Sequence, residues 1–197
     1  MKSGSAAVIV ASVAWTTVPE AATAVSVPLS CTRGPSNQRA ELLVTIPASV
    51  EAGSTFTARF DGKNSGPISH TGLNYIHEMT TELLVPTGAT YVEGSAHIIP
   101  NTGTANVRAG ARVTKQGNTI TLFLPAHVED GSNYTPPSFE FQVKVTAAAG
   151  AKVAQRFSQY RVTANAIIVG DVHTVCDPTP KPYTVGTTNV VAAPAQP

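Results

Sequence analysis

Residues 83–96 read Leu-Leu-Val-Pro-Thr-Gly-Ala-Thr-Tyr-Val-Glu-Gly-Ser-Ala. Apolar and β-branched residues on both sides of Pro86-Thr87-Gly88 predict two short strands joined at a tight corner. Gly94-Ser95 ends the second strand. Short apolar runs separated by Gly and Pro recur along the rest of the chain, so this stretch indicates an all-β protein.

Two further stretches alternate apolar and polar residues, which is the pattern of a half-buried strand. Residues 54–61 and 139–146 each place Phe, Val or Ala on one face and polar residues on the other. Residues 157–169 and 172–176 are predicted to be strands near the end of the chain. No stretch has the pattern of a crossover helix, which takes about a dozen residues. The sequence therefore predicts a single all-β domain, an antiparallel immunoglobulin-like β-sandwich.

Residues 73–85 fit two patterns. With a period of two, Tyr75, Met79 and Leu83 face inward, as in a strand. With the helical period, Ile76, Met79 and Leu83 share a face instead. The surrounding β pattern favours the strand, and the helix stays open as an alternative.

The first 24 residues have the order of a secretory signal peptide. Lys2 precedes the uncharged run Ala6–Trp15, and Ala22-Thr23-Ala24 offers small residues to a signal peptidase, so we expect cleavage after Ala24. The apolar run is shorter than the roughly 20 residues that a membrane-spanning helix needs. No later stretch is apolar for long enough, so we expect no transmembrane segment in the mature chain.

The chain after the signal peptide divides into two parts. Residues 25–177 hold all the predicted strands and form the sandwich. Residues 178–197 are rich in Pro and Ala. Because Pro-rich segments are stiff and extended, we expect residues 178–197 to form a C-terminal tail that does not pack.

Charge is sparse and nearly balanced. The chain has a formal net charge of +1, and 13% of its residues are charged, about half the usual share. Without a basic excess, nucleic acid is not an expected partner and an anionic membrane exerts no attraction. Low net charge also gives little repulsion between copies, which suits a protein held in a surface layer or assembly.

The chain has two cysteines, Cys31 and Cys176. In an exported protein an even count favours a disulfide, which here would close a loop of about 145 residues. A zinc site is disfavoured because the sequence contains no Cys-x-x-Cys. His173, three residues before Cys176, would supply only one of the two ligand pairs that a zinc motif needs. Two free thiols, or a contact with another chain, are the alternatives.

No motif predicts catalysis. Residues 77–81 (His-Glu-Met-Thr-Thr) begin like a zinc-protease helix, but Thr81 stands where that motif has its second histidine. The histidines are dispersed and predicted to lie at the surface or in turns, with a site gathered from several strands as the alternative: His70, His77, His97, His127 and His173. We expect no catalytic residue, no cofactor and no metal ligand.

Residues 129–137 (Glu-Asp-Gly-Ser-Asn-Tyr-Thr-Pro-Pro) predict a long exposed loop. Exposed loops of sandwiches carry binding, so Glu129, Asp130, Asn133 and Tyr134 are the candidate interaction residues. Tyr134 comes first among them because it is aromatic. A calcium loop is the alternative, but the required spacing of acidic ligands is missing.

Several of these stretches resemble the bacterial conserved-repeat immunoglobulin-like surface domains, a family of domains of unknown function. Members tend to read Asn-x-Gly, then Pro-x-Gly-x-x-Tyr/Phe-Val-x-Gly-Ser, then an alternating Phe/Val strand. The matching stretches are residues 64–66, 86–95 and 139–145, and the likeness spans about Gly53 to Ala149. The resemblance implies an exported sandwich used as a spacer or adhesive module. Members usually occur in tandem arrays, whereas this chain has one copy.

These observations predict a secreted, non-enzymatic protein of the bacterial cell envelope with a structural or interaction role, either adhesion or spacing. We expect it to be extracellular or associated with the envelope, and its partner to be a protein or another envelope component. The alternative is an extracellular carrier that binds a small apolar or lipid ligand between the two sheets. A carrier needs a cavity of roughly 300 Å³ or more, whereas a spacer is packed solid.

Overall fold

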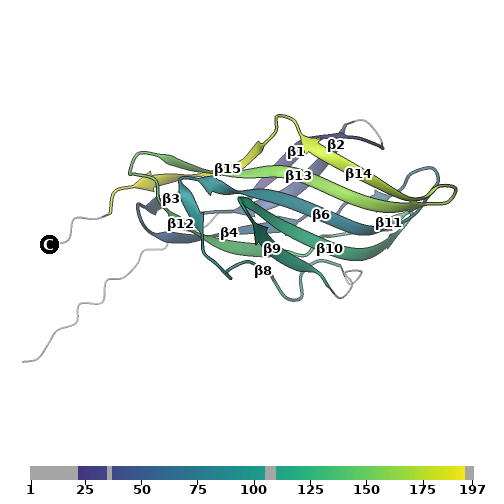
Figure 1. Cartoon of the computed structure of the whole chain (residues 1–197), viewed down its shortest axis with the longest axis horizontal. Coiled ribbons are helices and arrows are strands. Elements are labelled where there is room, and N and C mark those ends of the chain that lie inside the picture. Colours follow the sequence, from purple (N-terminus) through teal and green to yellow (C-terminus); the bar gives the residue numbers. More distant parts are fainter. Residues whose placement is uncertain (1–21, 35–36, 105–109, 194–197) are drawn as a thin grey trace, which may run out of the picture.

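A computed structural model of the chain describes residues 22–34, 37–104 and 110–193, and all regular structure in these ranges is β-strand. Two layers of strands run along the longest axis of the molecule (Figure 1). The first layer has the order β9 (Arg112–Gln116), β10 (Thr119–Glu129), β6 (Leu73–Thr87), β13 (Lys152–Ala166), β14 (Gly170–Pro178). The second has the order β1 (Ala22–Cys31), β2 (Gln38–Thr45), β4 (Thr55–Gly62), β12 (Phe139–Val145), β7 (Ala89–Tyr91), with β8 (His97–Ile98) beside β12.

Four short or late strands complete the fold. β15 (Tyr183–Val191) pairs with the first half of β13 and, in parallel, with β3 (Ser49–Glu51). β5 (Pro67–Ile68) and β11 (Ser132–Asn133) form a separate two-stranded ladder. Every other strand pair is antiparallel, which confirms the predicted all-β antiparallel sandwich.

Alternating side chains explain why these residues form strands. In β12 the residues at odd positions are buried and those between them are largely exposed, and β10 alternates in the same way. This period of two places one face of each strand toward the opposite layer. The alternation of residues 54–61 and 139–146 therefore correctly predicted β4 and β12, which pair with each other.

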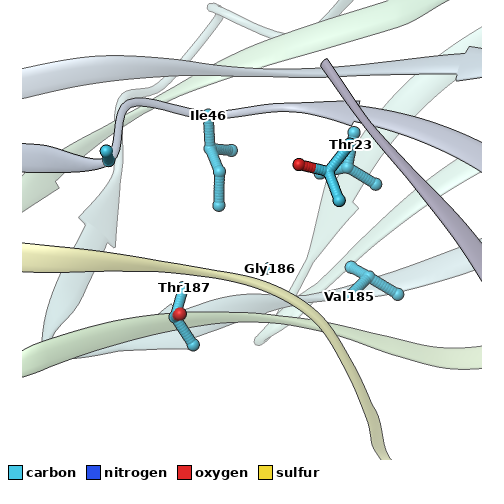
Figure 2. Close-up of a pocket in the computed structure, with 7 residues that line it drawn as sticks. Thr23, Ile46, Val185, Gly186 and Thr187 are labelled. Atoms are coloured by element: carbon cyan, nitrogen blue, oxygen red, sulfur yellow. The ribbon is translucent and has the colours of Figure 1, made fainter. Parts of the chain in front are cut away.

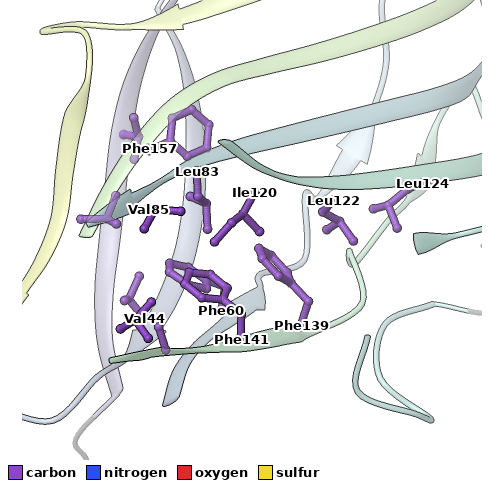
Figure 3. Packing of buried hydrophobic residues seen from close by; sticks show 14 of the residues in the cluster. Val44, Phe60, Leu83, Val85, Ile120, Leu122, Leu124, Phe139, Phe141 and Phe157 are labelled. Carbon is purple, nitrogen blue, oxygen red and sulfur yellow. The ribbon is translucent and has the colours of Figure 1, made fainter. Parts of the chain in front are cut away.

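Side chains from both layers meet in one apolar core (Figure 3). Phe60 of β4 stacks on Phe139 and Phe141 of β12, with ring centroids 5.2 and 5.8 Å apart. Leu83 and Phe157 from the first layer are also almost fully buried. The space between the layers is thus filled with aromatic and aliphatic side chains.

The corner predicted at Pro86-Thr87-Gly88 carries the chain from one layer to the other. β6 ends at Thr87 in the first layer, and β7 begins at Ala89 beside β12 in the second. Gly88 has a φ of +81°, and a Cβ there would lie 2.9 Å from the Cβ of Ala147. Only glycine combines that backbone conformation with so close an approach.

Residues 73–85 belong to strand β6, so the strand alternative was correct and the helical one was wrong. Met79 and Leu83 are buried as predicted, but Ile76 is buried in place of Tyr75. The register of β6 shifts against both neighbours at His77, which is skipped in each ladder. An extra residue of this kind is a β-bulge, and it reverses which side chains face the core.

The predicted disulfide between Cys31 and Cys176 is confirmed, with Cα atoms 4.0 Å apart. The two cysteines lie opposite each other where β1 pairs with β14. That ladder has three residue pairs, Leu29–Cys31 against Cys176–Pro178, and it joins the second layer to the first. The disulfide therefore fixes a short junction between the layers.

The predicted signal peptide lies mostly in residues 1–21, outside the described residues. Its last three residues, Ala22–Ala24, form the start of β1 and pair with Leu43–Thr45 of β2. Cleavage after Ala24 stays a prediction, and it would shorten the β1–β2 ladder by these three pairs.

The prediction that residues 178–197 form an unpacked tail is wrong for the middle of the segment. Tyr183–Val191 form β15, and Val185 and Val190 are buried in the core. The flanking prolines suggested an extended tail, but Val and Thr between them have the β-branched character of a strand. The sandwich therefore extends well beyond residue 177, its predicted end.

Candidate functional site

The predicted interaction loop is tied to the rest of the protein. Ser132 and Asn133 pair with Ile68 and Pro67. The backbone N–H of Asp130 donates to the carbonyl of Asn74, and that of Gly131 donates to the carbonyl of Ile68. Glu129, Asp130 and Asn133 are exposed as expected. Their loop, however, is held in place by these hydrogen bonds.

Tyr134 is the exception, and its prediction as an exposed binding residue is wrong. Its side chain is 2% exposed and belongs to the core. Its backbone N–H donates a hydrogen bond to the Ser65 hydroxyl. The Ser65 N–H in turn donates to the carbonyl of Tyr134. These bonds hold the loop so that the ring points inward. The Gly, Asn and Pro residues that predicted the loop give no sign of such long-range bonds.

Burial of Tyr134 and Tyr160 predicts a loss of stability in alkali. Desolvation, and for Tyr134 the nearby Tyr160 as well, raises the pKa of both phenols, to about 12 for Tyr160. An unfolded tyrosine ionises near pH 10. Above that pH the unfolded chain therefore binds fewer protons than the folded chain, and the free energy of unfolding falls by up to about 1.4 kcal/mol per pH unit per tyrosine. Urea unfolding between pH 9 and 11 should show this slope, and Tyr160→Phe should reduce it; equal slopes would contradict the assignment.

The turn between β13 and β14 exposes three consecutive large aliphatic side chains. Ile167 is 72%, Ile168 93% and Val169 70% exposed. The sequence predicted a strand through residue 169, because β-branched residues favour strands. The strand instead ends at Ala166, and the chain turns back to Gly170. We call Ile167–Val169 the apolar turn.

The apolar turn lies at one end of the long axis, and the last residues of β15 lie toward the other (Figure 1). The N–H of Ile167 donates to the carbonyl of Gly72. The segment that contains Gly72 also carries the bonds to residues 130 and 131 described above. Residues 67–74, 129–133 and 165–171 thus form one connected surface, which we call the distal end.

Side chains at the base of the apolar turn are also fixed. Asn74 Nδ2 donates to Asn165 Oδ1, and Asn165 Nδ2 donates to Asp171 Oδ1 at 3.0 Å. His77 Nε2 lies 3.3 Å from Asp171 Oδ1. The bond from Asn165, and then the nearby His77, hold the pKa of Asp171 below its ordinary value. Asp171 is therefore an anion at neutral pH.

The distal end is acidic around its apolar turn. Glu129, Asp130 and Asp171 lie in two of its three segments, and none of the three segments contains Lys or Arg. Large apolar side chains rimmed by polar and charged ones are typical of an interaction surface. The turn is held by backbone and side-chain hydrogen bonds, so little conformational entropy would be lost on binding.

The bulge at His77 gathers aromatic rings beside the distal end. The Tyr75 ring lies 4.4 Å from that of His127 and 6.0 Å from that of His77. The prediction of dispersed histidines therefore missed this grouping, because a bulge cannot be read from periodicity.

In the described ranges, no group of three or more His, Cys, Asp or Glu residues is placed to hold a metal ion. The same ranges contain no helix long and apolar enough to cross a membrane.

No protein-family model and no curated protein matches the chain. Several solved structures resemble the chain remotely. A cohesin module of a family 33 glycoside hydrolase from Clostridium perfringens is 8% identical, with a TM-score of 0.39, over 85% of this chain and 99% of that chain. The collagen-binding domain of a Staphylococcus aureus adhesin is 11% identical, with a TM-score of 0.37, over 70% and 89%.

A putative membrane-anchored protein from Corynebacterium diphtheriae is 14% identical, with a TM-score of 0.42, over 89% of this chain and 38% of that chain. At such identities and scores, the likeness carries no argument about what this chain binds. The similarity to the conserved-repeat surface domains stays a resemblance.

Proposed function

We propose that this chain is an exported, non-enzymatic interaction module of the bacterial cell envelope, and that it contacts a protein partner through its distal end. The observation that carries the proposal is the exposure of Ile167, Ile168 and Val169 on a braced turn. Soluble proteins seldom leave such a cluster in water unless it binds something.

Two other features support this proposal. The disulfide between Cys31 and Cys176 suits an oxidising compartment outside the cytoplasm. The centre between the layers is filled by Phe60, Phe141 and their neighbours, as expected of an interaction module or spacer. A lipid carrier of the kind considered above would need that space for its ligand.

Replacing the apolar turn should weaken attachment to the envelope. In the turn variant, Ile167→Ser, Ile168→Ser and Val169→Ser are combined. Each aliphatic side chain that becomes fully buried contributes about 1.5–3 kcal/mol, and 1.4 kcal/mol is a factor of ten in affinity. We therefore expect binding to weaken by more than about tenfold. The measurement is binding of labelled protein to host cells that lack the chain.

The matched control is Val191→Ser, which removes an exposed valine from β15 near the opposite end of the molecule. It should bind as the wild type does. If the turn variant binds as tightly as Val191→Ser, the distal end is not the contact surface and the proposal is wrong.

A further inference from the structure

A row of paired residues crosses four strands at the distal end. Glu129 of β10 pairs with Tyr75 of β6, and Tyr75 pairs on its other side with Asn165 of β13. Asn165 pairs in turn with Asp171 of β14. Neighbouring strands lie about 4.8 Å apart, so three spacings, roughly 14 Å, separate Glu129 from Asp171. Asp171 therefore lies at the base of the apolar turn, and Glu129 lies to one side of the turn, across β6.

Among the described residues, no lysine or arginine forms an ion pair with a carboxylate of the distal end. The lysines and arginines that form ion pairs engage other acidic residues: Glu41, Asp61, Glu82, Glu93 and Asp177. Glu129 lies near a histidine instead, with its Oε1 3.7 Å from His127 Nε2. The described lysines and arginines therefore leave the negative charge of the distal end unbalanced.

The distal end differs in charge from the rest of the chain. Its segments together carry three acidic residues and no Lys or Arg, whereas the whole chain has a formal net charge of +1. The residues outside the distal end therefore sum to +4. Charges act over about 10 Å at 0.1 M salt, so all three carboxylates would act on a partner seated on the apolar turn. Such a surface attracts a positively charged partner and repels a negatively charged one.

A pocket of about 350 Å³ lies on the side of the sandwich between β15 and β2 (Figure 2). Its lining residues are uncharged: Thr23, Val44, Ile46, Ala48, Val185, Gly186 and Thr187. Thr23 precedes the predicted cleavage point after Ala24, so cleavage there would remove part of the wall. The pocket therefore offers no charge that would select a partner, in contrast to the distal end.

The apolar turn is a projection, since Ile168 at its middle is 93% exposed, and burying a projection requires a recess in the partner. We propose that the partner of the distal end is a protein surface with lysine or arginine side chains around an apolar recess. The recess takes Ile167–Val169, and the positive side chains face Glu129, Asp130 and Asp171. This inference rests on the proposed function, since it names the chemistry of the partner at the same surface.

Removing two of the carboxylates tests the sign of the partner's charge. The acidic variant combines Glu129→Gln and Asp130→Asn. Both substitutions keep a side-chain oxygen acceptor, which preserves the bond from the His70 N–H to position 130. Asp171 is left unchanged because it accepts the bond from Asn165 at the base of the turn.

Binding of labelled protein to host cells that lack the chain is measured at low and high salt. The buffer is held at about pH 8, above the range in which histidine ordinarily gains its charge. At about 50 mM salt, the acidic variant should bind roughly two- to thirtyfold more weakly than the wild type, the combined size of two exposed ion pairs. At about 500 mM salt the two proteins should bind alike, because screening removes the contribution of the charges.

The matched control combines Glu41→Gln and Glu93→Gln, which remove the same charge outside the distal end. The side chains of Glu93 and Glu129 are similarly exposed, at 76% and 73%. The control should bind as the wild type does at both salt concentrations. The positively charged partner is overturned if the acidic variant binds as the control does. It is also overturned if wild-type binding tightens as salt rises, which is the result expected of an anionic envelope polymer.

The turn variant separates this inference from the proposed function. Screening does not remove apolar contact, so the turn variant should bind weakly at both salt concentrations. The proposed function fails if the turn variant binds as Val191→Ser does. If the turn variant binds weakly while the acidic variant binds as its control does, the distal end remains the contact surface and only the positively charged partner is wrong.

Discussion

Replacing both cysteines, as in Cys31→Ser with Cys176→Ser, is expected to lower the free energy of unfolding by up to about 4–5 kcal/mol. The bond closes a loop with a sequence separation of 145, and the chain-entropy model gives this magnitude for a loop of about that length. The loss should be large because the bond lies at the three-pair ladder that joins β1 to β14. Urea unfolding of the double variant beside the oxidised wild type measures it.

Reduction of the wild type provides the control, because it opens the bond without changing the sequence. Reduced wild type and the double variant should unfold at similar urea concentrations. A double variant with the stability of the oxidised wild type would show that the β1–β14 junction needs no covalent support.

Phe141→Ala is expected to cost roughly 3–5 kcal/mol, the range for removing a buried phenylalanine. The Phe141 side chain is 0% exposed and stacks on Phe60 across the β4–β12 pair. The cavity would open at the centre of the core, where neighbours on several strands cannot all move inward. Denaturant unfolding measures the loss.

Phe123→Ala makes the same chemical change on β10, where the ring is only partly buried and lies against the Arg112 guanidinium. Its cost should be about 1 kcal/mol, the size of a partly exposed cation–π contact. Equal losses for the two variants would contradict the position of Phe141 in the core.

The alternating strands and the corner at Gly88 could be predicted because their signals are local. Residues 139–146 show the period of two, and Pro86-Thr87-Gly88 has the turn chemistry, within a few residues. The disulfide could be predicted because the chain has two cysteines and the features of an exported protein. Residues 183–191 were missed because nearby prolines outweighed their β-branched residues.

The candidate site was harder to predict because it depends on long-range contacts. Glu129, Asp130 and Asn133 do belong to the distal end, but Tyr134 is turned inward by its bonds to Ser65. Ile167–Val169 have the composition of a strand interior, and the turn at Ala166 is fixed by pairing with Gly170. Gly170-Asp171 was the local sign of that turn, and it was outweighed by the apolar run.

Binding of the turn variant to host cells tests the central claim most directly, with Val191→Ser measured in parallel. The account predicts that Val191→Ser binds as the wild type does, while the turn variant loses more than about tenfold in affinity. Equal binding by all three proteins would contradict the claim that the distal end is the contact surface.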